Sequence, residues 1–422
     1  MRWIVLGASL VIQTCLGAVY AWSAFVPALK RDHGLTGGQA GLVFGVTIAV
    51  FTVAMVFAGR MQESRGPRPV ASVGAALFGA GYLLASFSGG SFPILLASLG
   101  VLAGAGTGFG YVCPLTTSVR WFPRHKGLIA GVAVAGFGGG AVLLSGVAGS
   151  LLARGVPVLD LFRLVGLVYG AATLAGALLL RTPEPPGAAA QPLLPFRVLT
   201  ASREFRSLAI GMFAGTFGGL LVVGNLGPMG LAAGLPSDMA ILSIQVFALG
   251  NAAGRVGWGW LHDRVGRPAL PISLLALLSA IVALAAAESA AAFVGMAGVT
   301  GFCFGACFVL YAAQVSAAFG YTRLGGIYPF IFLAYGFSGL TGPAFGGWIH
   351  DLTGGFTLAV VAAAAILALG AAAVHQAGRR RPGDALAPTL PPERPESAAV
   401  RERAHPVISS RAERASVREG IP

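Results

Sequence analysis

The sequence predicts an all-α membrane protein with twelve transmembrane helices, and three observations support this fold class. First, 56% of the 422 residues are hydrophobic and 10% are charged, whereas about a quarter of the residues in an ordinary soluble domain are charged. Second, apolar runs long enough to cross about 30 Å of hydrocarbon recur along the chain. Third, the 63 glycines suit helices that pack closely within a membrane. This composition excludes a water-soluble globular enzyme.

A transmembrane helix needs about 20 predominantly apolar residues. Twelve runs meet this requirement, at residues 3–29, 39–59, 69–88, 91–116, 127–153, 160–180, 206–233, 239–261, 269–287, 290–316, 326–349 and 355–376. The first run is longer than the apolar part of a signal peptide and is followed directly by further runs. We therefore expect it to remain as the first helix.

The distribution of positive charge predicts the orientation of these helices. With a cytoplasmic N-terminus, 23 of the 28 Arg and Lys residues fall in inward loops or in the C-terminal tail. Those that would face outward are Lys30, Arg31, Arg154 and Arg163. Because cytoplasmic loops carry an excess of Lys and Arg, both termini are predicted to be cytoplasmic, and we expect a multi-pass protein of the cell (inner) membrane.

Two polar segments divide the chain. Residues 181–205 are rich in Pro, Ala and Arg and are predicted to be a cytoplasmic linker between an N-terminal six-helix half, 1–180, and a C-terminal six-helix half, 206–376. Residues 377–422 are rich in Arg, Pro, Glu and Ser and cannot bury a core, so they are predicted to form a disordered cytoplasmic tail.

A loop motif occurs twice, 200 positions apart. GRMQESRGPR at 59–68 follows the second run, and GWLHDRVGR at 259–267 follows the eighth. The glycines permit tight turns, an acidic side chain can accept hydrogen bonds at a neighbouring helix N-terminus, and the arginines can hold the helix ends. We predict a cytoplasmic gate formed by Gly259, Asp263, Arg264, Gly266, Arg267, Glu63, Arg65 and Gly66. The alternative is a pair of ordinary charged turns.

The loop at 259–267 resembles the signature loop of the major facilitator superfamily. Further motifs are similar to the oxalate/formate antiporter family and its monocarboxylate transporter relatives: GAVYAWS at 17–23, RWFP at 120–123 followed by Lys126 and Gly127, and NAAGR at 251–255. The resemblance spans all twelve runs. It implies the two-half major facilitator fold and secondary transport of small organic anions by a monomeric unit embedded in lipid.

The site is predicted from charge. Apart from residues at helix ends, the twelve runs hold one charge at membrane depth, Arg255. Placing this charge at the centre of a bilayer costs about 3 kcal/mol even on the insertion scale that gives the lowest values, so Arg255 must face protein or a water-filled cavity. No Asp or Glu lies at the same depth. The predicted partner is therefore an anion that binds and leaves, since a guanidinium holds a carboxylate through two hydrogen bonds. The alternative is a structural arginine that caps backbone carbonyls.

Asn251 lies one helical turn before Arg255 on the same face. It is predicted to orient the guanidinium or to bind a substrate hydroxyl, the alternative being a contact between helices. The resemblance to eukaryotic monocarboxylate transporters implies an Asp at this position that is linked with proton coupling. Asn does not titrate, so that part of the mechanism does not transfer to this chain.

Tyr335 marks another difference from the relatives. The resemblance to oxalate carriers implies that a Lys of helix 11 binds the second carboxylate, and Tyr335 occupies the matching position. A second carboxylate would leave an unpaired charge in an apolar cavity, at a cost of several kcal/mol. We therefore predict a monocarboxylate substrate such as L-lactate, pyruvate or a short-chain acid.

The resemblance also implies an aromatic lining for the central cavity. The residues that it places there are Tyr20, Tyr111, Phe137, Phe304, Phe308 and Phe332, together with Tyr335. Phenol hydroxyls can bind a carboxylate or a 2-hydroxyl group, while phenyl rings enclose a short alkyl chain. The alternative for each aromatic side chain is packing against lipid or a neighbouring helix.

Energetics limit how transport is coupled. An inside-negative potential opposes anion uptake by about 2.3 kcal/mol per 100 mV, so accumulation needs a proton, whereas exchange of anions does not. Resemblance to the monocarboxylate branch favours proton-linked transport, and oxalate/formate-type anion exchange is the alternative. The titratable candidates at helix ends are Asp32, His33, His262, Asp263, His350 and Asp351.

Other classes of function are less consistent with the sequence. The net charge of +13 lies in loops and the tail, with no aromatic interleaving, so no nucleic-acid partner is expected. Cys303 and Cys307 share a helix face, but no His or carboxylate lies nearby to complete a metal site. No catalytic constellation, metal or cofactor is predicted, and we expect no enzymatic activity. A receptor on the same scaffold would be distinguished by its lack of flux.

Overall fold

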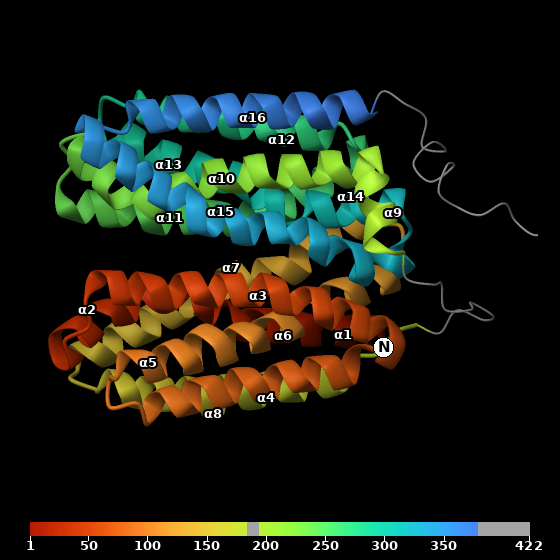
Figure 1. Ribbon diagram of the computed structural model, residues 1–422, viewed down its shortest axis with the longest axis horizontal. Coiled ribbons are helices and arrows are strands. Elements are labelled where there is room, and N and C mark those ends of the chain that lie inside the picture. Colours follow the sequence, from red (N-terminus) through yellow and green to blue (C-terminus); the bar gives the residue numbers. More distant parts are fainter. Residues whose placement is uncertain (184–193, 379–422) are drawn as a thin grey trace, which may run out of the picture. The chain divides into compact units, whose positions relative to one another are not determined.

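The structure is a computed structural model that describes residues 1–183 and 194–378. Within these ranges all the regular structure is helical, and the long helices run side by side (Figure 1). Residues 184–193 of the predicted linker and residues 379–422 of the predicted tail lie outside the described residues. The predictions of a linker and of a disordered tail are therefore not tested over those positions.

The helices before residue 184 form what we call the first bundle. Its elements are α1 (Arg2–Leu16), η1 (Gly17–Ala21), α2 (Trp22–His33), α3 (Gly37–Arg65), α4 (Pro67–Ser86), α5 (Phe92–Leu95), η2 (Leu96–Ala103), α6 (Gly104–Trp121), α7 (Lys126–Ala153) and α8 (Val158–Leu179). Elements η1 and η2 are a 3₁₀ and a π segment inside longer helices. The chain thus continues through α1, η1 and α2 as one long helical segment.

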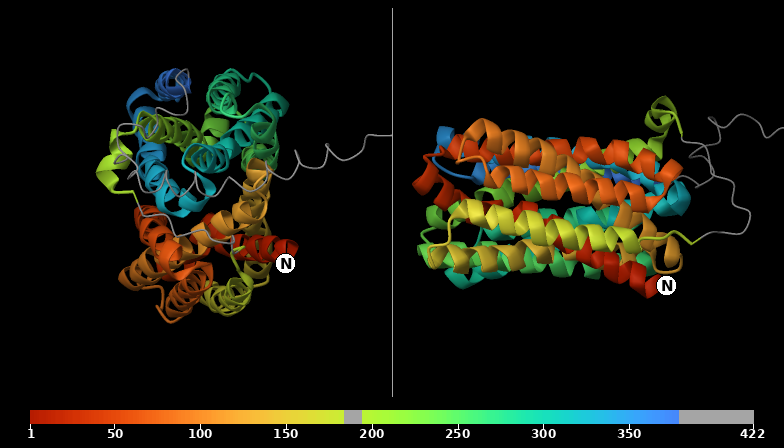
Figure 2. Two further views of the ribbon diagram at one scale, coloured as in Figure 1. Left: turned by 90° about the vertical axis from the view of Figure 1, so that its right-hand side faces the viewer. Right: turned by 90° about the horizontal axis from the view of Figure 1, so that it is seen from below.

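The helices after residue 202 form the second bundle. They are α10 (Arg203–Ala232), α11 (Ser237–Val265), α12 (Ala269–Ala285), α13 (Ala290–Gly305), η3 (Ala306–Phe308), α14 (Leu310–Ala318), η4 (Tyr321–Arg323), α15 (Leu324–Thr353) and α16 (Thr357–Gly378). Seen end-on, the two bundles are separate groups of helices, the first in red to yellow and the second in green to blue (Figure 2, left).

Among the described residues, eleven helices are long and apolar enough to cross a membrane, counting helices joined through an η segment as one. The predicted run at 269–287 coincides with α12, an apolar helix of 17 residues. Within the predicted linker at 181–205, the structure places the short helix α9 (Phe196–Ala201) and the start of α10. Phe196 packs on Phe330 with ring centroids 5.1 Å apart, a tertiary contact that six residues of sequence do not reveal.

Local sequence explains several helix boundaries. Thr36 accepts a hydrogen bond from the backbone N–H of Gln39, whose side chain accepts one from the N–H of Thr36, so α3 begins with a capping box. Ser289 caps α13 through the N–H of Ala292. Gly354, at φ 71°, ends α15 in the left-handed conformation that favours glycine.

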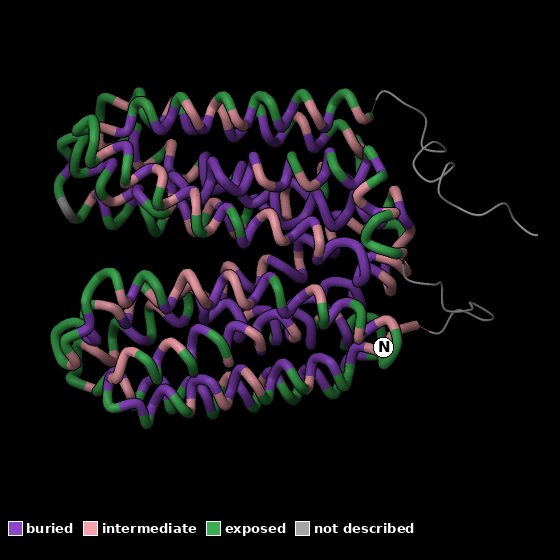
Figure 3. The backbone as a smooth tube through the Cα atoms, viewed as in Figure 1, coloured by how far each residue is buried: buried purple, intermediate pink, exposed green. Residues whose placement is uncertain are grey.

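The outer surfaces of both bundles are apolar. Exposed side chains include Phe57, Trp348 and Leu369, and the exposed residues of α16 lie on its outer side (Figure 3). Inside each bundle, the buried residues face neighbouring helices (Figure 3). Large apolar side chains on an outer surface are what a lipid-facing helix presents.

The bundles join mainly where α7 packs on α11 and α3 packs on α15, and α7 also contacts α14 while α6 contacts α15. Glycine makes the two main contacts close. A Cβ on Gly127 would overlap the carbonyl oxygen of Gly259, and the reverse is also true. A Cβ on Gly59 would overlap the carbonyl oxygen of Gly325. Backbones therefore meet directly at these points, as in small-residue seams between membrane helices.

Candidate functional site

The candidate site lies where α7 and α11 meet at the centre of the helices, beside two interruptions of regular helix. Tyr20 belongs to the 3₁₀ segment η1, and Phe308 belongs to the 3₁₀ segment η3. Gly305, directly before η3, allows close approach to α11, because a Cβ there would lie 2.6 Å from the carbonyl oxygen of Asn251. These local breaks bring side chains of both bundles to one place.

Arg255 is the charged group of this site. Its side chain comes from α11 and the residue is 2% exposed. Nε donates to Oδ1 of Asn251 at 3.1 Å, and Nη1 donates to the carbonyl oxygen of Val134 on α7 at 2.8 Å. Cζ lies 4.3 Å from the ring centroid of Phe308. The guanidinium is thus held by one amide, one backbone carbonyl of the other bundle, and one aromatic face.

No carboxylate pairs with Arg255 among the residues that the structure describes. Nη2 of Arg255 donates no hydrogen bond within these ranges. Nδ2 of Asn251 is also buried without a hydrogen-bond partner in the described chain, and the Tyr111 hydroxyl lies beside that of Tyr328. The site therefore offers several hydrogen-bond donors around one buried positive charge, which is an arrangement suited to an anion.

Aromatic rings surround the guanidinium. Arg255 lines a pocket with Tyr20, Phe51, Tyr111, Phe137, Phe308 and Phe332. The rings contact one another edge to face or stacked: Phe137 lies 5.3 Å from both Tyr20 and Tyr111, and Tyr111 lies 5.5 Å from Phe332. The pocket is too small in this conformation to hold a water molecule. A ligand of Arg255 therefore requires these rings to move apart.

Two tyrosine hydroxyls close one side of this cluster. The hydroxyl of Tyr20, from η1 in the first bundle, hydrogen-bonds to the hydroxyl of Tyr335, from α15 in the second. The Tyr335 ring also packs on Phe332 and Phe308, with centroids 4.9 and 5.4 Å away. This pair and the bond from Arg255 to Val134 are both contacts between the bundles.

The structure brings most of the expected site residues together. Tyr20, Tyr111, Phe137, Phe308, Phe332 and Arg255 line the pocket, while Asn251 and Tyr335 contact residues that line it. Phe304 lies behind Phe308, with ring centroids 5.2 Å apart, and does not line the pocket.

Three contributors were not expected from the sequence. Phe51 of α3 lines the pocket, Tyr328 of α15 packs on Phe332 with tilted rings and centroids 5.4 Å apart, and the Val134 carbonyl accepts a hydrogen bond from the guanidinium. A phenylalanine in an apolar run and a backbone carbonyl carry no local signal of function. Only the packing of α3, α7 and α15 around α11 identifies them.

The expected gate residues fall into three environments. The Asp263 carboxylate of the second bundle accepts hydrogen bonds from the N–H groups of Gly127 and Leu128, at 2.7 and 2.8 Å, where α7 begins. This is the favourable placement of an anion at a helix N-terminus. Glu63 of the first bundle lies against the start of α15, since a Cβ on Gly325 would be 3.7 Å from its Oε1. Both acidic residues thus reach across to the other bundle.

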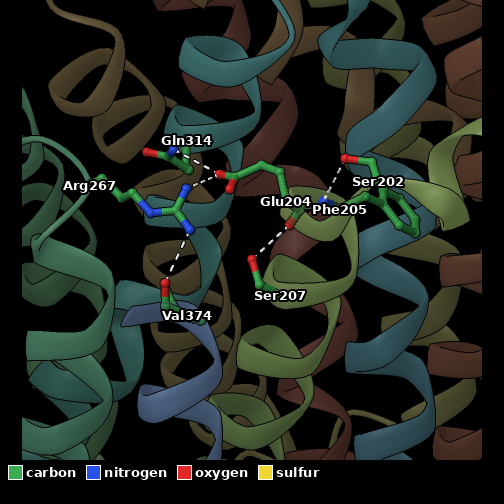
Figure 4. Close-up of polar contacts among 7 residues, drawn as sticks. All are labelled: Ser202, Glu204, Phe205, Ser207, Arg267, Gln314 and Val374. Carbon is green, nitrogen blue, oxygen red and sulfur yellow. Dashed lines mark hydrogen bonds and ion pairs between the residues drawn. The ribbon is translucent and has the colours of Figure 1, made fainter. Parts of the chain in front are cut away.

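The two arginines of the second loop motif, Arg267 and Arg264, have different partners. Arg267 forms an ion pair with Glu204 and donates to the carbonyl oxygen of Val374 at 3.1 Å (Figure 4). Gln314 donates to the same Glu204 oxygen at 3.0 Å. This cluster ties α10, α14 and α16 of the second bundle. Arg264 lies over the Trp260 ring at 3.7 Å.

The remaining positions of the motifs serve the turns. Gly66 and Gly266 have φ values of 80° and 68°, which only glycine adopts readily. Gly259 forms the close contact with Gly127 described above. Arg65 is exposed and makes a 4.0 Å contact with the sulfur of Met61.

The other titratable candidates lie away from Arg255. Asp32 pairs with its neighbour Arg31, and Nδ1 of His350 lies 3.7 Å from Asp351. His262 is buried beside Gln314 and Asp263. Within residues 1–183 and 194–378, no group of three or more His, Cys, Asp or Glu is placed to hold a metal ion.

Known proteins resemble this chain in sequence and in fold. The chain is 27% identical over 360 residues to the oxalate:formate antiporter of Oxalobacter formigenes, covering 82% of this chain and 85% of that protein. It is 28% identical to human monocarboxylate transporter 11, covering 87% and 81%. The solved structure of the proton:xylose symporter XylE superposes with a TM-score of 0.72 at 14% identity, covering 89% of this chain and 95% of that one.

The family assignment rests on more than half of the chain. The model of the Major Facilitator Superfamily matches residues 8–268. The apolar helices described above fit an integral, multi-pass membrane protein. This protein is a member of the Major Facilitator Superfamily, whose fold and family are those of transporters.

Proposed function

We propose that this protein is a secondary transporter of small monocarboxylates, such as L-lactate, pyruvate or short-chain acids. One observation carries the proposal. Arg255 is buried between the bundles, and no carboxylate in the described chain neutralises it. A buried cation is costly unless it is paired, so an anionic substrate is its natural partner. Relatives named for oxalate, formate and monocarboxylates support an organic anion.

The charge balance of the pocket favours one carboxylate over two. Among the described residues that line it, Arg255 is the sole cation, and the others are aromatic. Tyr335, at the position where oxalate carriers have Lys, contributes a hydroxyl. A monocarboxylate would neutralise Arg255 and place its short alkyl part among the rings, whereas a dicarboxylate would bury an unpaired charge.

The proposed mechanism is alternating access. Twelve membrane-crossing helices, with α12 as the ninth, would form two six-helix halves, 1–180 and 206–376, with both termini in the cytoplasm of an inner-membrane protein. The halves would rock about Arg255 as a single functional unit. In this orientation the contacts of Asp263 and Glu63 lie at the cytoplasmic end and would seal it in the conformation described.

Coupling is proposed to be proton-linked, by analogy with the monocarboxylate relatives. Asn251 does not titrate, so the proton would travel with the substrate or with a residue other than this one. The second candidate function is anion exchange of the oxalate/formate type. The similarity to the oxalate:formate antiporter favours it, and exchange needs no proton site because the bound carboxylate neutralises Arg255.

Uptake of radiolabelled L-lactate into proteoliposomes tests the proposal. Wild type is compared with Arg255→Ala and with Arg154→Ala, a control that removes an exposed arginine at the C-terminal end of α7. We expect uptake that an inward proton gradient stimulates, that only Arg255→Ala abolishes, and that oxalate does not inhibit. Uptake that needs internal anion and is inhibited by oxalate would instead establish exchange. An absence of flux in the wild type, with acetate, pyruvate and lactate alike, contradicts both.

A further inference from the structure

Partly buried arginines lie in two different environments at the end of the protein where α3 and α6 end and α10 and α15 begin. Within the second bundle, Arg267 has a carboxylate of its own, and Glu204 also receives Gln314 (Figure 4). Positive charge there is matched by negative charge. In this cluster the arginine charge is neutralised by a carboxylate of the same bundle.

Between the bundles, the matching negative charge is missing. Arg60 of α3, Arg120 of α6 and Arg323 of η4 all lie within electrostatic range of a single carboxylate, Glu63. None of the ion pairs found in the described ranges involves any of these three arginines. Arg60 is exposed, so among the half-buried groups two positive charges, Arg120 and Arg323, share one negative charge across the junction, which leaves an excess of one.

Hydrogen bonding in this cluster is incomplete on both sides, because Oε1 of Glu63 is also buried without a donor in the described chain. Nη2 of Arg120 donates to the carbonyl oxygen of Thr322 at 3.0 Å, a bond between the bundles. Nε of Arg120 and Nε of Arg323 are both buried, with no acceptor in the part of the chain that the structure describes. Buried N–H donors are nearly always satisfied in folded proteins. The single Glu63 carboxylate does not balance the charges of the two arginines that carry these donors, so a further anion would neutralise the cluster.

The rim of the cluster is also positive and aromatic. Cζ of Arg60 lies 4.8 Å from the ring centroid of Phe330, and Nζ of Lys126 lies 5.6 Å from that of Tyr321. Asp263, the other acidic residue of the predicted gate, already accepts hydrogen bonds from the N–H groups at the start of α7. The neighbouring acidic group therefore does not supply the missing charge.

We propose that Arg120 and Arg323, with Arg60 at the rim, form a second anion site that takes a small oxyanion, either a carboxylate or a phosphate group. Guanidinium Nε–H and Nη–H groups present the paired donors that such oxygens accept. The anion comes either from solution or from a lipid headgroup, since both carry the same chemistry. This site is separate from Arg255 and does not depend on the identity of the transported substrate.

The location gives the site a consequence for transport. Arg120 belongs to the first bundle and Arg323 to the second, so an anion bound by both bridges the junction. Bound anion stabilises the conformation in which these ends are together and disfavours the conformation in which they separate. Occupancy therefore raises thermal stability and slows the transport cycle.

Binding is tested on the purified full chain by thermal unfolding and calorimetry with inorganic phosphate and with acetate, at constant ionic strength in sodium chloride. The variants are Arg120→Gln, Arg323→Gln and the conservative Arg323→Lys, which keeps the charge but lacks Nε. Arg264→Gln is the matched control. Measuring phosphate also in the Arg255→Ala background separates this site from the central one.

We expect a saturable rise in melting temperature with phosphate in the wild type, in Arg264→Gln and in Arg255→Ala. Affinity should fall about tenfold or more in Arg120→Gln and Arg323→Gln, as expected for the loss of a charge-assisted hydrogen bond, and less in Arg323→Lys. In nanodiscs, a stabilisation by phosphatidylglycerol that competes with phosphate identifies the lipid headgroup as the source. Loss of the effect in Arg255→Ala, an equal effect in every variant, or no effect of phosphate and phosphatidylglycerol overturns the proposal.

Discussion

Arg255 of α11 donates a hydrogen bond to the backbone carbonyl of Val134 on α7, so the charged side chain of the proposed substrate site also joins the two bundles. A carboxylate that approaches Arg255 meets a guanidinium whose Nε and Nη1 are already engaged, and whose Nη2 donates to no atom of the described chain. Binding of substrate and the contact between bundles therefore depend on the same group.

Replacement of Arg255 should abolish transport without preventing folding. In Arg255→Gln, the bond to Asn251 can persist while the charge is lost, and uptake of L-lactate should fall about 100-fold or more, which corresponds to the 3–5 kcal/mol of a buried charge pair. Initial uptake rates in proteoliposomes measure this. Arg255→Lys should also be severely impaired, because an ammonium lacks the planar fork. Retention of more than half the wild-type rate in either variant is incompatible with the proposed role.

Asn251 should act by positioning Arg255. Asn251→Ala removes the oxygen that accepts from Nε, and we expect uptake to fall about tenfold, the effect of one hydrogen bond to a charged group. Asn251→Asp should be worse at neutral pH, since its carboxylate competes with the substrate for the guanidinium. Affinity for L-lactate, measured from the concentration dependence of uptake, should weaken in both. An Asn251→Asp variant with wild-type affinity argues against this geometry.

Tyr335 should control selection between one and two carboxylates. Tyr335→Lys adds a second cation beside the pocket. The concentration of oxalate that inhibits lactate uptake should therefore be at least about tenfold lower than in the wild type, since neutralising one charge contributes more than 1.4 kcal/mol. Tyr335→Phe is the control, because it loses the bond to Tyr20 but gains no charge. Equal oxalate sensitivity in the two variants means that residue 335 does not set the charge preference.

The contact of α7 with α11 should tolerate no added methyl group at Gly131. A Cβ there would overlap the carbonyl oxygen of Arg255, and such overpacking costs about 1–3 kcal/mol. Gly131→Ala should lower the melting temperature and reduce uptake. Gly139→Ala, on the same helix with nothing within 4 Å of its Cβ, should be neutral or slightly stabilising because alanine favours helix. Thermal unfolding of both variants decides the point.

Asp263 should help to keep its end of the bundles closed. Asp263→Asn removes the negative charge at the start of α7, which is worth about 1 kcal/mol, and retains one acceptor for two N–H groups. A cysteine introduced as Leu128→Cys should then react faster with a membrane-impermeant maleimide, measured against the chain without that cysteine. Asp238→Asn, in the first turn of α11 at the opposite end, is the matched control and should leave the rate unchanged.

Much of the architecture follows from the chain read in isolation. The ends of the predicted runs agree with the helix ends to within six residues. The reason is that an apolar segment inside a membrane must satisfy its backbone hydrogen bonds internally and therefore forms a helix. The same reasoning singled out Arg255, since a lone charge in such a run is rare. It missed α9, whose six residues carry no periodicity and are held by the contact of Phe196 with Phe330.

The sequence by itself determined the all-helical membrane class, the family and the charge of the proposed site, because hydropathy and ionisable groups are properties of individual residues. The tertiary structure decided what surrounds that charge: the Val134 carbonyl, the Phe51 ring and the paired hydroxyls of Tyr20 and Tyr335. It also decided that Arg120 and Arg323 come together across the junction with buried Nε–H groups that no described acceptor receives. These relationships join positions far apart in the chain, and only close packing of glycine-lined helices brings them into contact.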